Sequence, residues 1–505
     1  MTSLATALRT YPTNYTIERD LKAENNKSNH SLTHINKCAD ILDRVSKLFM
    51  LPGEFNAQML AKVIEPHAGK NKHQVLSGII IRIVSFALFL ISLPFAVFTV
   101  PIGMVLRAIE HTYRPAMCYT DNSGTKEAKA KKISELELSK EKPFTIRTHN
   151  VGFVTTSMST TGDLRHPVER ARELVNSINN DPAKPDVIFF QETFHKDASK
   201  ILREGIKNEY PYIIDNIAPQ ISGFNSGSMV ASKYPISHSK FNRFAHMLPP
   251  ESMSPRGVTR IVLESPKGPL LLYGVHTQAL LGERRAIARY MQLIHLKHLM
   301  EKDKETYTNA MQIVCGDFNT SRINAWGEDN IDPRNQAEAQ TLQRMDDFFD
   351  DVYLRDHVDR NGARTYGEPE PIYLKIDNLR LGLAENALQE PRGTWFHGPF
   401  ADPGCLLNGK MRYDRWKHNR DNPKPLEGLF KQKCTWGTPE WHTDQTANTA
   451  RFDYILLPKN QKSLDGRAEI RRPWVPKGSQ SSSSDHLPVD GRFWLNTLAQ
   501  PLPLL

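Results

Sequence analysis

Short apolar segments alternate with helical segments between residues 143 and 498, and this alternation constrains the fold more than any other feature of the sequence. Apolar segments such as PDVIFFQ and MQIVCGD are rich in β-branched and aromatic residues, which favours strands. Helical spacing is strongest in residues 283–302 and 336–349. Strands that alternate with helices are typical of α/β proteins. We therefore predict one α/β domain over residues 143–498.

Most of these predicted strands end in an acid, an amide or an imidazole. One such residue is commonly a turn or cap residue, but six sites of this kind in one domain are hard to attribute to chance. Because α/β sheets assemble their sites at the carboxyl ends of strands, we expect these side chains to converge. They are Asn150, Glu192, His276, Asp317 with Asn319, Asp453, and Asp485 with His486.

The charge of the chain argues against a protein that grips duplex DNA. The 505 residues carry a formal net charge of +9, with 24% charged and 39% hydrophobic residues, which excludes a collagen, a coiled coil and a multi-span transporter. The first 142 residues hold 19 basic and 13 acidic side chains, so the remainder is close to neutral. Because nucleases of duplex DNA usually carry a stronger basic surface, a nucleic acid partner is disfavoured.

The cysteines are odd in number and scattered, and none forms a CxxC pair. This pattern predicts neither a zinc knuckle nor a disulfide framework. We interpret the cysteines as reduced thiols, which places the catalytic domain in a reducing, cytoplasmic compartment. They are Cys38, Cys118, Cys315, Cys405 and Cys434.

Residues 83–106 contain no charged side chain and are long enough to cross a bilayer as one helix. Pro94 and Pro101 complicate this interpretation, because proline removes a hydrogen bond inside a helix and kinks it. Two alternatives remain open: a hairpin that enters one leaflet and turns near Leu93 and Pro94, and a helix buried in a protein core. Basic residues on both flanks favour an insertion with both ends on the cytoplasmic side.

These patterns divide the chain into regions. Residues 1–76 form a polar N-terminal region without the pattern of a signal peptide, and residues 77–118 form a hydrophobic membrane segment. A charged linker over residues 119–142 leads to the catalytic domain at 143–498. Loop insertions are expected around residues 345–448, where they would control the choice of substrate.

The order of six segments establishes a resemblance. From Asn150 to His486 the chain contains HNVGF, QETF, GVHTQ, CGDFN, RFDYIL and SDHLPV. This series resembles the endonuclease/exonuclease/phosphatase superfamily. The resemblance implies a two-sheet α/β sandwich that cleaves phosphoesters with a divalent cation, usually Mg²⁺, with Mn²⁺ as an alternative.

A second set of segments resembles the neutral sphingomyelinase branch of that superfamily. It consists of FNSGSMVASKYPI at residues 224–236 and QETFHKDASKILREGIKNEYPYII at residues 191–214. The resemblance implies a phosphodiesterase of the phospholipase C type that hydrolyses sphingomyelin to ceramide and phosphocholine. Its partners would be a membrane lipid substrate and a bilayer, and no protein partner is expected.

The resemblance also implies roles for the polar residues. Glu192 and Asn150 would bind the metal, while Asp485 would bind a second metal or support the other ligands. Attack by water requires a general base, for which Asp317 and His486 are the candidates. The sphingomyelinase branch favours His486, and Asp317 would then orient the water or assist the leaving group.

The remaining residues would act around the general base and the phosphate. Asp453 would hold His486 in the reactive tautomer. His276 and Asn319 would donate hydrogen bonds to the non-bridging phosphate oxygens. Asn225 would contact the phosphate or the headgroup, or would only shape a glycine-containing turn.

Three other functions can be weighed against this hypothesis. A phosphoinositide phosphatase would carry Cys-Asp-Arg at residues 452–454, where this chain has Phe-Asp-Tyr, and a nuclease would have little use for residues 77–106. A catalytically silent binding module would have lost one or more of the polar residues, and all of them are present. Arg256, with Glu251 nearby, forms either a basic loop beside the phosphate or a solvated turn.

Overall fold

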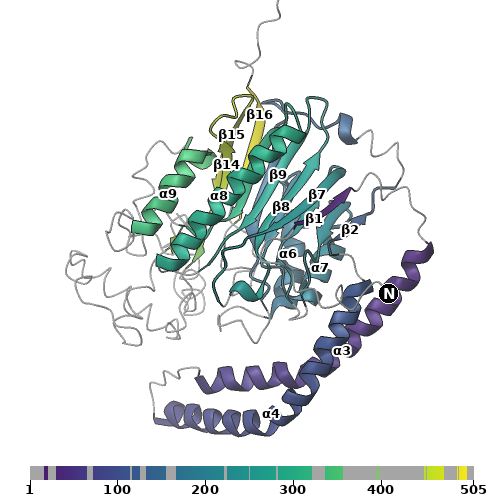
Figure 1. Cartoon of the computed structure of the whole chain (residues 1–505), viewed down its shortest axis with the longest axis vertical. Coiled ribbons are helices and arrows are strands. Elements are labelled where there is room, and N and C mark those ends of the chain that lie inside the picture. The colour runs from purple at the N-terminus through teal and green to yellow at the C-terminus, as the bar shows by residue number, and fades with distance from the viewer. Residues whose placement is uncertain are drawn as a thin grey trace, which may run out of the picture.

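Two seven-stranded sheets pack face to face in the computed structural model, and helices lie on their outer faces (Figure 1). The strand order is β1-β7-β8-β9-β10-β14-β11 in one sheet and β15-β16-β3-β4-β6-β5-β2 in the other. This arrangement confirms the predicted two-sheet α/β sandwich. The structure describes residues 16–20, 30–64, 72–113, 116–124, 132–154, 166–220, 224–249, 251–279, 283–320, 336–355, 395–396, 449–450, 452–470, 486 and 488–496.

The strands and helices have the following bounds. The first sheet contains β1 (Thr16–Asp20), β7 (Ile236–Arg243), β8 (Gly257–Leu263), β9 (Leu270–His276), β10 (Met311–Asp317), β14 (Asp453–Pro458) and β11 (Phe349–Asp351). The second contains β15 (Leu464–Ile470), β16 (Val489–Leu495), β3 (Phe144–Asn150), β4 (Val187–Gln191), β6 (Met229–Ser232), β5 (Tyr212–Asp215) and β2 (Cys118–Asp121), while β12 (Trp395–Phe396) pairs with β13 (Thr449–Ala450). The helices are α3 (His30–Ile64), α4 (Lys72–Tyr113), α6 (Pro167–Asn180), α7 (Lys196–Ile206), α8 (Glu283–Thr306) and α9 (Gln336–Phe348), with 3-10 turns at Glu251–Met253 and Val352–Arg355.

The central strands are apolar on both faces because both faces are covered. Every residue of β4, β9 and β10 is buried. One apolar cluster, which includes Phe189, Leu272 and Ile313, fills the space between the sheets. A second cluster joins the first sheet to α8, and a third joins the second sheet to α6 and α7. The result is a four-layer helix–sheet–sheet–helix core.

The strand register brings the predicted polar residues to one end of the sandwich. In the parallel pair β3 and β4, Asn150 lies opposite Gln191, the residue before Glu192. In the parallel pair β9 and β10, His276 lies opposite Asp317. The first residue of β14, Asp453, pairs antiparallel with Asp317. Parallel strands present their carboxyl ends at the same edge, so the convergence expected from the sequence occurs.

The folded domain also includes residues that precede position 143. Strand β1 pairs with β7 in one sheet, and β2 pairs with β5 in the other. Leu136 and Leu138, within the predicted linker, are buried in the core between the sheets. Edge strands of this kind carry short, polar-rich patterns, which explains why the sequence suggested a later start. The insertions predicted around residues 345–448 lie outside the described residues, except at 345–355 and 395–396.

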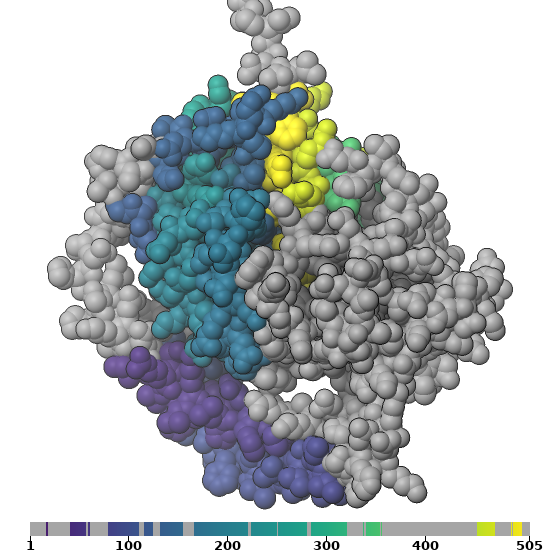
Figure 2. Space-filling model, turned by 180° about the vertical axis from the view of Figure 1, so that it is seen from behind, coloured from purple at the N-terminus to yellow at the C-terminus, as the bar shows by residue number. Residues whose placement is uncertain are grey.

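Helices α3 and α4 pack side by side as a hairpin that projects from one end of the molecule (Figures 1 and 2). Helix α4 continues through Pro94 and Pro101, so the turn predicted at Leu93 and Pro94 does not occur. The chain instead bends, as Figure 1 shows, and a proline kink accounts for the bend. Asn56 of α3 donates hydrogen bonds to the carbonyl oxygen of Phe89 (2.8 Å) and to the hydroxyl group of Ser92 (3.0 Å), just before that kink.

The apolar surface of α4 faces outward and is not buried against the sandwich. Residues Ile79–Glu110 form a helix long and apolar enough to cross a membrane, and only 11% of its most apolar window is buried. Ile91 and Phe98 are 65% and 75% exposed. The alternative of a helix buried in a protein core is therefore wrong. This part of the chain is a candidate membrane segment.

Candidate active site

Six of the predicted site residues meet at the carboxyl end of the central strands. His486, which lies just before β16, joins the side chains that end β3, β9 and β10, the one that follows β4 and the one that begins β14. Asp485 lies outside the described residues, so its predicted role stays a prediction. The six that come together are Asn150, Glu192, His276, Asp317, Asp453 and His486.

Asp317 is the centre of this group. Its carboxylate accepts hydrogen bonds from Asn150 Nδ2 (2.9 Å) and from the backbone N–H of Asn319 (2.8 Å). The Nε2 atoms of His276 and His486 lie 3.6 and 4.0 Å from Asp317 Oδ2. The buried carboxylate of Asp317 therefore contacts or faces the side chains that the other strands bring to the site.

Burial and the nearby charge of Asp453 raise the pKa of Asp317 to about 7. His486 and the hydrogen bonds from Asn150 and Asn319 act in the opposite direction and lower this pKa. A carboxyl group with a raised pKa is costly to ionise inside the folded protein. Such groups are typical of functional sites, where they bind cations or exchange protons.

We expect Asp317→Asn to raise the free energy of unfolding of the metal-free protein more at pH 8 than at pH 5. The difference between the two effects should exceed about 1 kcal/mol. The raised folded-state pKa means that ionisation of Asp317 opposes folding fully above pH 7. This opposition fades as the pH falls toward and below the ordinary aspartate pKa of 3.8, where the carboxyl group is protonated in both states. Thermal unfolding in EDTA at pH 5 and pH 8 would measure the difference. Asp350→Asn, at a more exposed site, is the control, and an equal shift at both pH values would contradict the prediction.

His486 and Asp453 form a buried imidazole–carboxylate pair. His486 Nδ1 lies 2.8 Å from Asp453 Oδ2, and both side chains are almost fully buried. With an ionised carboxylate as the acceptor, Nδ1 is the donor, and the Nε2 lone pair then points toward Asp317 and the centre of the site. This is the orientation that the sequence predicted for a general base with its orienting acid.

His276 is a neutral imidazole at the floor of the site. Burial, together with the positive charges of Arg256 and His486, holds the pKa of His276 well below its usual range. Within the described residues neither of its ring nitrogens has a hydrogen-bond partner, although Nε2 lies 3.7 Å from Glu192 Oε1. A buried imidazole whose ring nitrogens have no partner is costly unless a ligand or ion contacts it. This arrangement therefore points to a ligand above the floor of the site.

Glu192 reaches the site through an unusual backbone conformation. Its φ angle is +60°, which is uncommon for a residue other than glycine. The turn is fixed on both sides, because the N–H of Val151 donates to the carbonyl of Gln191 (3.0 Å) and the N–H of Thr193 donates to that of Gly227 (2.9 Å). Strained conformations of this kind are retained where function requires a side chain in one place.

The donor set fits a divalent cation. Glu192, His276 and Asp317 each offer one ligand atom, and these atoms lie within 4.8 Å of one another. Asp317 forms a second such group with Asp453 and His486. Carboxylate oxygens are the ligands that Mg²⁺ prefers, and the unpartnered ring of His276 would gain a neighbour. Asn150 donates to Asp317, and its Oδ1 accepts from the N–H of Gly152 (3.1 Å). Its predicted role as a metal ligand stays a prediction.

Arg256 lies beside Glu192 and not in a solvated turn. Its guanidinium is buried, donates to the carbonyl oxygen of Thr277 (2.8 Å) and lies 3.8 Å from Glu192 Oε1. Glu251 is also buried, and it accepts a hydrogen bond from Gln278 (2.7 Å). The alternative of a solvated turn is therefore wrong, and a contact between this loop and a phosphate stays a prediction.

Arg170 of α6 is a further site residue, and sequence patterns did not reveal it. Its side chain is fully buried and donates to the carbonyl oxygens of Val151 (2.9 Å) and Gly152, the two residues after Asn150. It also lies over the ring of Phe153, 5.5 Å from the centroid. Because its contacts are with backbone carbonyls, they fix the loop that carries Asn150. The only signal in the sequence is an arginine on the apolar face of a predicted helix.

We expect Arg170→Met to lower activity by about tenfold or more and to lower the unfolding midpoint. The change removes two donors to buried carbonyls and releases the loop after Asn150, although it keeps much of the side-chain volume. Arg172→Met, on the exposed side of the same helix, is the matched control. Activity and thermal unfolding of both variants would be measured well below either midpoint, and equal behaviour of the two would refute this role.

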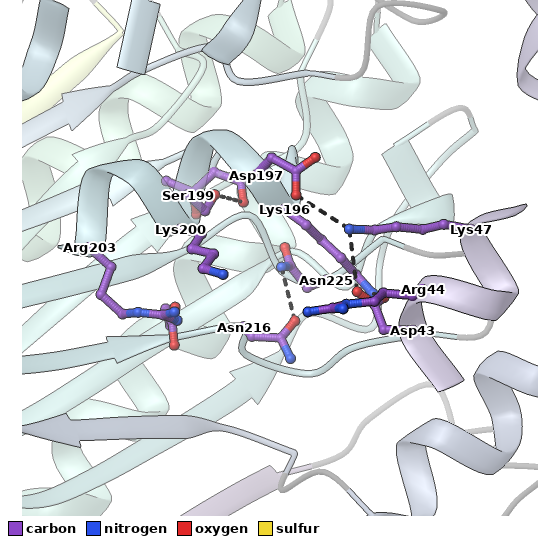
Figure 3. Close-up of a pocket in the computed structure, with 12 residues that line it drawn as sticks. Asp43, Arg44, Lys47, Lys196, Asp197, Ser199, Lys200, Arg203, Asn216 and Asn225 are labelled. Carbon is purple, nitrogen blue, oxygen red and sulfur yellow. Dashed lines mark hydrogen bonds and ion pairs between the residues drawn. The ribbon is translucent and has the colours of Figure 1, made fainter. Parts of the chain in front are cut away.

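Asn225 does not join the central group. Its Oδ1 accepts from the N–H of Gly227 (2.8 Å), and its Nδ2 donates to Asn216 (3.3 Å) in a neighbouring pocket that α3 also lines (Figure 3). Asn319, whose φ angle is +47°, donates weakly to the carbonyl of Thr277 (3.4 Å). Contacts of either residue with phosphate stay predictions.

A family model described as Endonuclease/Exonuclease/phosphatase family matches residues 148–486. A sphingomyelinase C from Leptospira interrogans is 27% identical over 191 residues, which are 34% of this chain and 34% of that relative, so the chain spans about a third of the relative's length. A beta toxin structure from Staphylococcus aureus with bound magnesium ions covers 70% of this chain and 99% of its own, at 18% identity and a TM-score of 0.41. Truncated TDP2 from Caenorhabditis elegans covers 71% and 100%, at 12% identity and a TM-score of 0.39.

Proposed function

The chain belongs to the endonuclease/exonuclease/phosphatase family, and we propose that it is a Mg²⁺-dependent phosphodiesterase that hydrolyses sphingomyelin to ceramide and phosphocholine at a membrane. The observation that carries the hydrolytic part is the His486–Asp453 pair, which faces a cluster of metal-binding side chains. The exposed apolar surface of α4 supports a membrane substrate. Similarity to a sphingomyelinase C supports the choice of headgroup.

Hydrolysis would proceed by attack of water on the phosphorus atom of the diester. His486 Nε2 accepts the proton of the water, and Asp453 stabilises the imidazolium that forms. The bond between phosphorus and the ceramide oxygen then breaks, and that oxygen takes up a proton as it leaves. Asp317 lies between His486 and His276, where it can orient the water or assist the leaving oxygen.

The charge that develops on the phosphoryl oxygens requires fixed positive groups. Glu192 and Asp317 would hold a divalent cation, which supplies Lewis-acid stabilisation of this charge. His276 and Arg256 lie on the same side of the site, and each can donate to a non-bridging oxygen. Asp485 and Asn225 remain candidates for a second metal ligand and a headgroup contact.

A substrate panel tests this proposal directly. The purified protein would be assayed with sphingomyelin, phosphatidylcholine, phosphoinositides and abasic DNA, with Mg²⁺ and with EDTA. We expect phosphocholine release from sphingomyelin that EDTA abolishes. Release of inorganic phosphate from phosphoinositides, or DNA cleavage, with sphingomyelin left intact, would assign the site to a phosphatase or a nuclease of the same family.

We expect Ile91→Glu with Phe98→Glu to release the protein from membranes by more than about tenfold, because each charge inside the hydrocarbon costs a few kcal/mol. Both side chains are exposed in the candidate membrane segment. The control carries Ile287→Glu with Ile294→Glu, at exposed positions of α8. The measurement is the protein fraction that stays with vesicles after a carbonate wash. Wild-type protein that is soluble and monodisperse without detergent would disprove membrane insertion.

A further inference from the structure

Gln278 lies two residues after His276, is fully buried, and has both donors and the acceptor oxygen of its side-chain amide occupied. Its Oε1 accepts a hydrogen bond from the N–H of Leu248 (2.8 Å). Its Nε2 donates to Glu251 Oε2 (2.7 Å) and to the carbonyl oxygen of Ala279 (3.1 Å). Because Leu248 and Glu251 belong to the loop between β7 and β8, this one amide joins that loop to the end of β9.

The carboxylate of Glu251 depends on this amide. It is buried, and among the described residues Gln278 Nε2 is the one hydrogen-bond donor that contacts it. A buried carboxylate that loses its donor is costly, so removal of the amide would favour a loop that opens toward water. The position of the loop is therefore tied to Gln278.

Helix α8 fixes the backbone of Gln278. The N–H of Gln278 donates to Gln292 Oε1 (2.9 Å), and its carbonyl oxygen accepts a hydrogen bond from Arg289 (3.1 Å). The side chains of Gln292 and Arg289 are themselves buried, and Gln292 Nε2 also donates to the carbonyl oxygen of His246 (2.6 Å), in the same loop. Hydrogen bonds to both backbone groups therefore fix the direction in which the Gln278 amide points.

The β7–β8 loop, residues 244–249 and 251–256, leads directly to Arg256. The N–H of Ser254 donates to the carbonyl oxygen of Glu251 (3.0 Å), and the N–H of Arg256 donates to that of Ser254 (2.9 Å). The Ser254 hydroxyl group also donates to the backbone carbonyl of Asn225 (3.0 Å), which precedes β6 of the second sheet. The loop therefore bridges the two sheets, and successive turns connect the contact at Glu251 to the backbone of Arg256.

Arg256 reaches the site from the last position of this loop. Its Nη1 donates to the carbonyl oxygen of Thr277 (2.8 Å), and its Nη2 lies 3.8 Å from Glu192 Oε1. Thr277 directly precedes Gln278, and it is fixed in turn, because its hydroxyl group donates to the carbonyl oxygen of Phe318 (2.5 Å). Two adjacent residues after β9 therefore hold this loop, one through its middle and the other through the guanidinium at its end.

We propose that Gln278 is a positioning residue for phosphodiester hydrolysis: its amide holds the β7–β8 loop in place and thereby fixes the guanidinium of Arg256 where charge develops on the phosphoryl oxygens. The inference rests on the hydrolysis proposed above, in which Arg256 donates to a non-bridging oxygen. A donor that is fixed in advance needs no reorganisation during the reaction. Loss of the amide should therefore lower turnover much more than it weakens substrate binding.

A double-mutant cycle measures whether Gln278 acts through Arg256. Gln278→Met removes the amide and keeps most of the side-chain volume. We expect kcat to fall by at least about tenfold, while KM changes by less than about threefold. In an Arg256→Met background the same substitution should cost less than about twofold, because the guanidinium that it displaces is already absent. The four full-length proteins would be assayed with sphingomyelin and Mg²⁺ well below their unfolding midpoints.

Gln312→Met is the matched control. Gln312 is an equally buried glutamine near the start of β10, at the opposite end of that strand from Asp317. Its amide donates to the hydroxyl group of Tyr273 (3.0 Å) and to the carbonyl oxygen of Met300 (2.9 Å). The control removes a buried amide in the same way, so we expect it to lower the unfolding midpoint and to leave kcat unchanged.

An exchange of the two partners provides a rescue. Gln278→Glu alone places two carboxylates against each other, whereas Gln278→Glu with Glu251→Gln restores one amide donor and one carboxylate acceptor. The N–H of Leu248 keeps an acceptor in both variants. We expect the exchange to raise kcat by at least about threefold over Gln278→Glu alone. Equal kcat values for these two variants would overturn the pairing of Gln278 with Glu251 as the cause.

Amide hydrogen exchange, followed by mass spectrometry, tests the loop without any reaction. The N–H of Leu248 and its neighbours in the β7–β8 loop should exchange at least about tenfold faster in Gln278→Met and at the wild-type rate in Gln312→Met. Unchanged exchange of this loop in Gln278→Met would overturn the proposal. Faster exchange with losses that multiply in the cycle would also overturn it, because Gln278 would then not act through Arg256. A wild type that hydrolyses no phosphodiester would refute the proposed function instead, and the exchange rates would still decide whether Gln278 holds the loop.

Discussion

Glu192→Gln is expected to lower turnover of sphingomyelin on the order of hundreds-fold or more, with partial recovery at high Mg²⁺. The substitution keeps the shape of the side chain and its place near His276 and Asp317, but it removes one negative charge from the proposed metal site. A weakened site can be refilled by mass action, so the apparent Mg²⁺ constant should rise together with the loss of turnover.

The measurement is initial rate against Mg²⁺ concentration for the wild type, Glu192→Gln and the exposed control Glu169→Gln. The control should match the wild type, because Glu169 lies on the exposed side of α6. The folded state of Glu192→Gln should be checked by thermal unfolding, since the positive φ angle at this residue is costly for Glu and Gln alike. Near-normal activity at low Mg²⁺ would show that Glu192 does not bind the metal.

The convergence of the site was predictable because it follows from strand polarity. Asn150 and Glu192 end neighbouring parallel strands, and so do His276 and Asp317. Parallel strands end at the same edge, so a polar residue after each apolar run is enough to place these side chains together. For Asp453 and His486 the predicted position at the end of a strand is wrong, because Asp453 begins β14 and His486 precedes β16. Asp453 still reaches the same edge, since β14 runs antiparallel to β10.

Of the residues that support the site, Arg170 was not predictable and Arg256 was only one of two alternatives, because their contacts are with the backbone. Arg170 and Arg256 donate to carbonyl oxygens of loops that lie far from them in the sequence. A carbonyl oxygen is present at every residue, so no pattern marks the one that needs a donor. In the same way, the sequence of β1 gives no sign of its partner β7 across more than 200 residues.

The α3–α4 hairpin shows a limit of a different kind. Prolines in the apolar run suggested a turn at Pro94, because proline disrupts a helix. Helix α4 continues through that position, and Asn56 of α3 donates to the carbonyl of Phe89 one turn earlier. Helix α3 itself contains Pro52 and packs along α4. Packing against α3 therefore determined that α4 stays helical through Pro94. The polar pattern of residues 1–76 did not predict this packing.

His486→Ala and Asp453→Asn are each expected to lower turnover by about 10²- to 10⁴-fold, while the Michaelis constant changes far less. Asp453 Oδ2 accepts the hydrogen of His486 Nδ1, and an amide at this position would offer the imidazole the wrong partner. The double variant should lose little more than either single variant, because two residues that act as one unit are strongly non-additive.

The pH–rate profile separates the two candidate bases. If His486 takes the proton from water, protonation of its ring stops turnover, so activity falls as the pH decreases and this acidic limb disappears in His486→Ala. Asp317 is the alternative source of an acidic limb, because burial and Asp453 raise its pKa to about 7. An acidic limb that survives in His486→Ala, or losses that multiply independently in the double variant, would make Asp317 the base. His486 would then serve to bind phosphate, 4.0 Å from the carboxylate that does the chemistry.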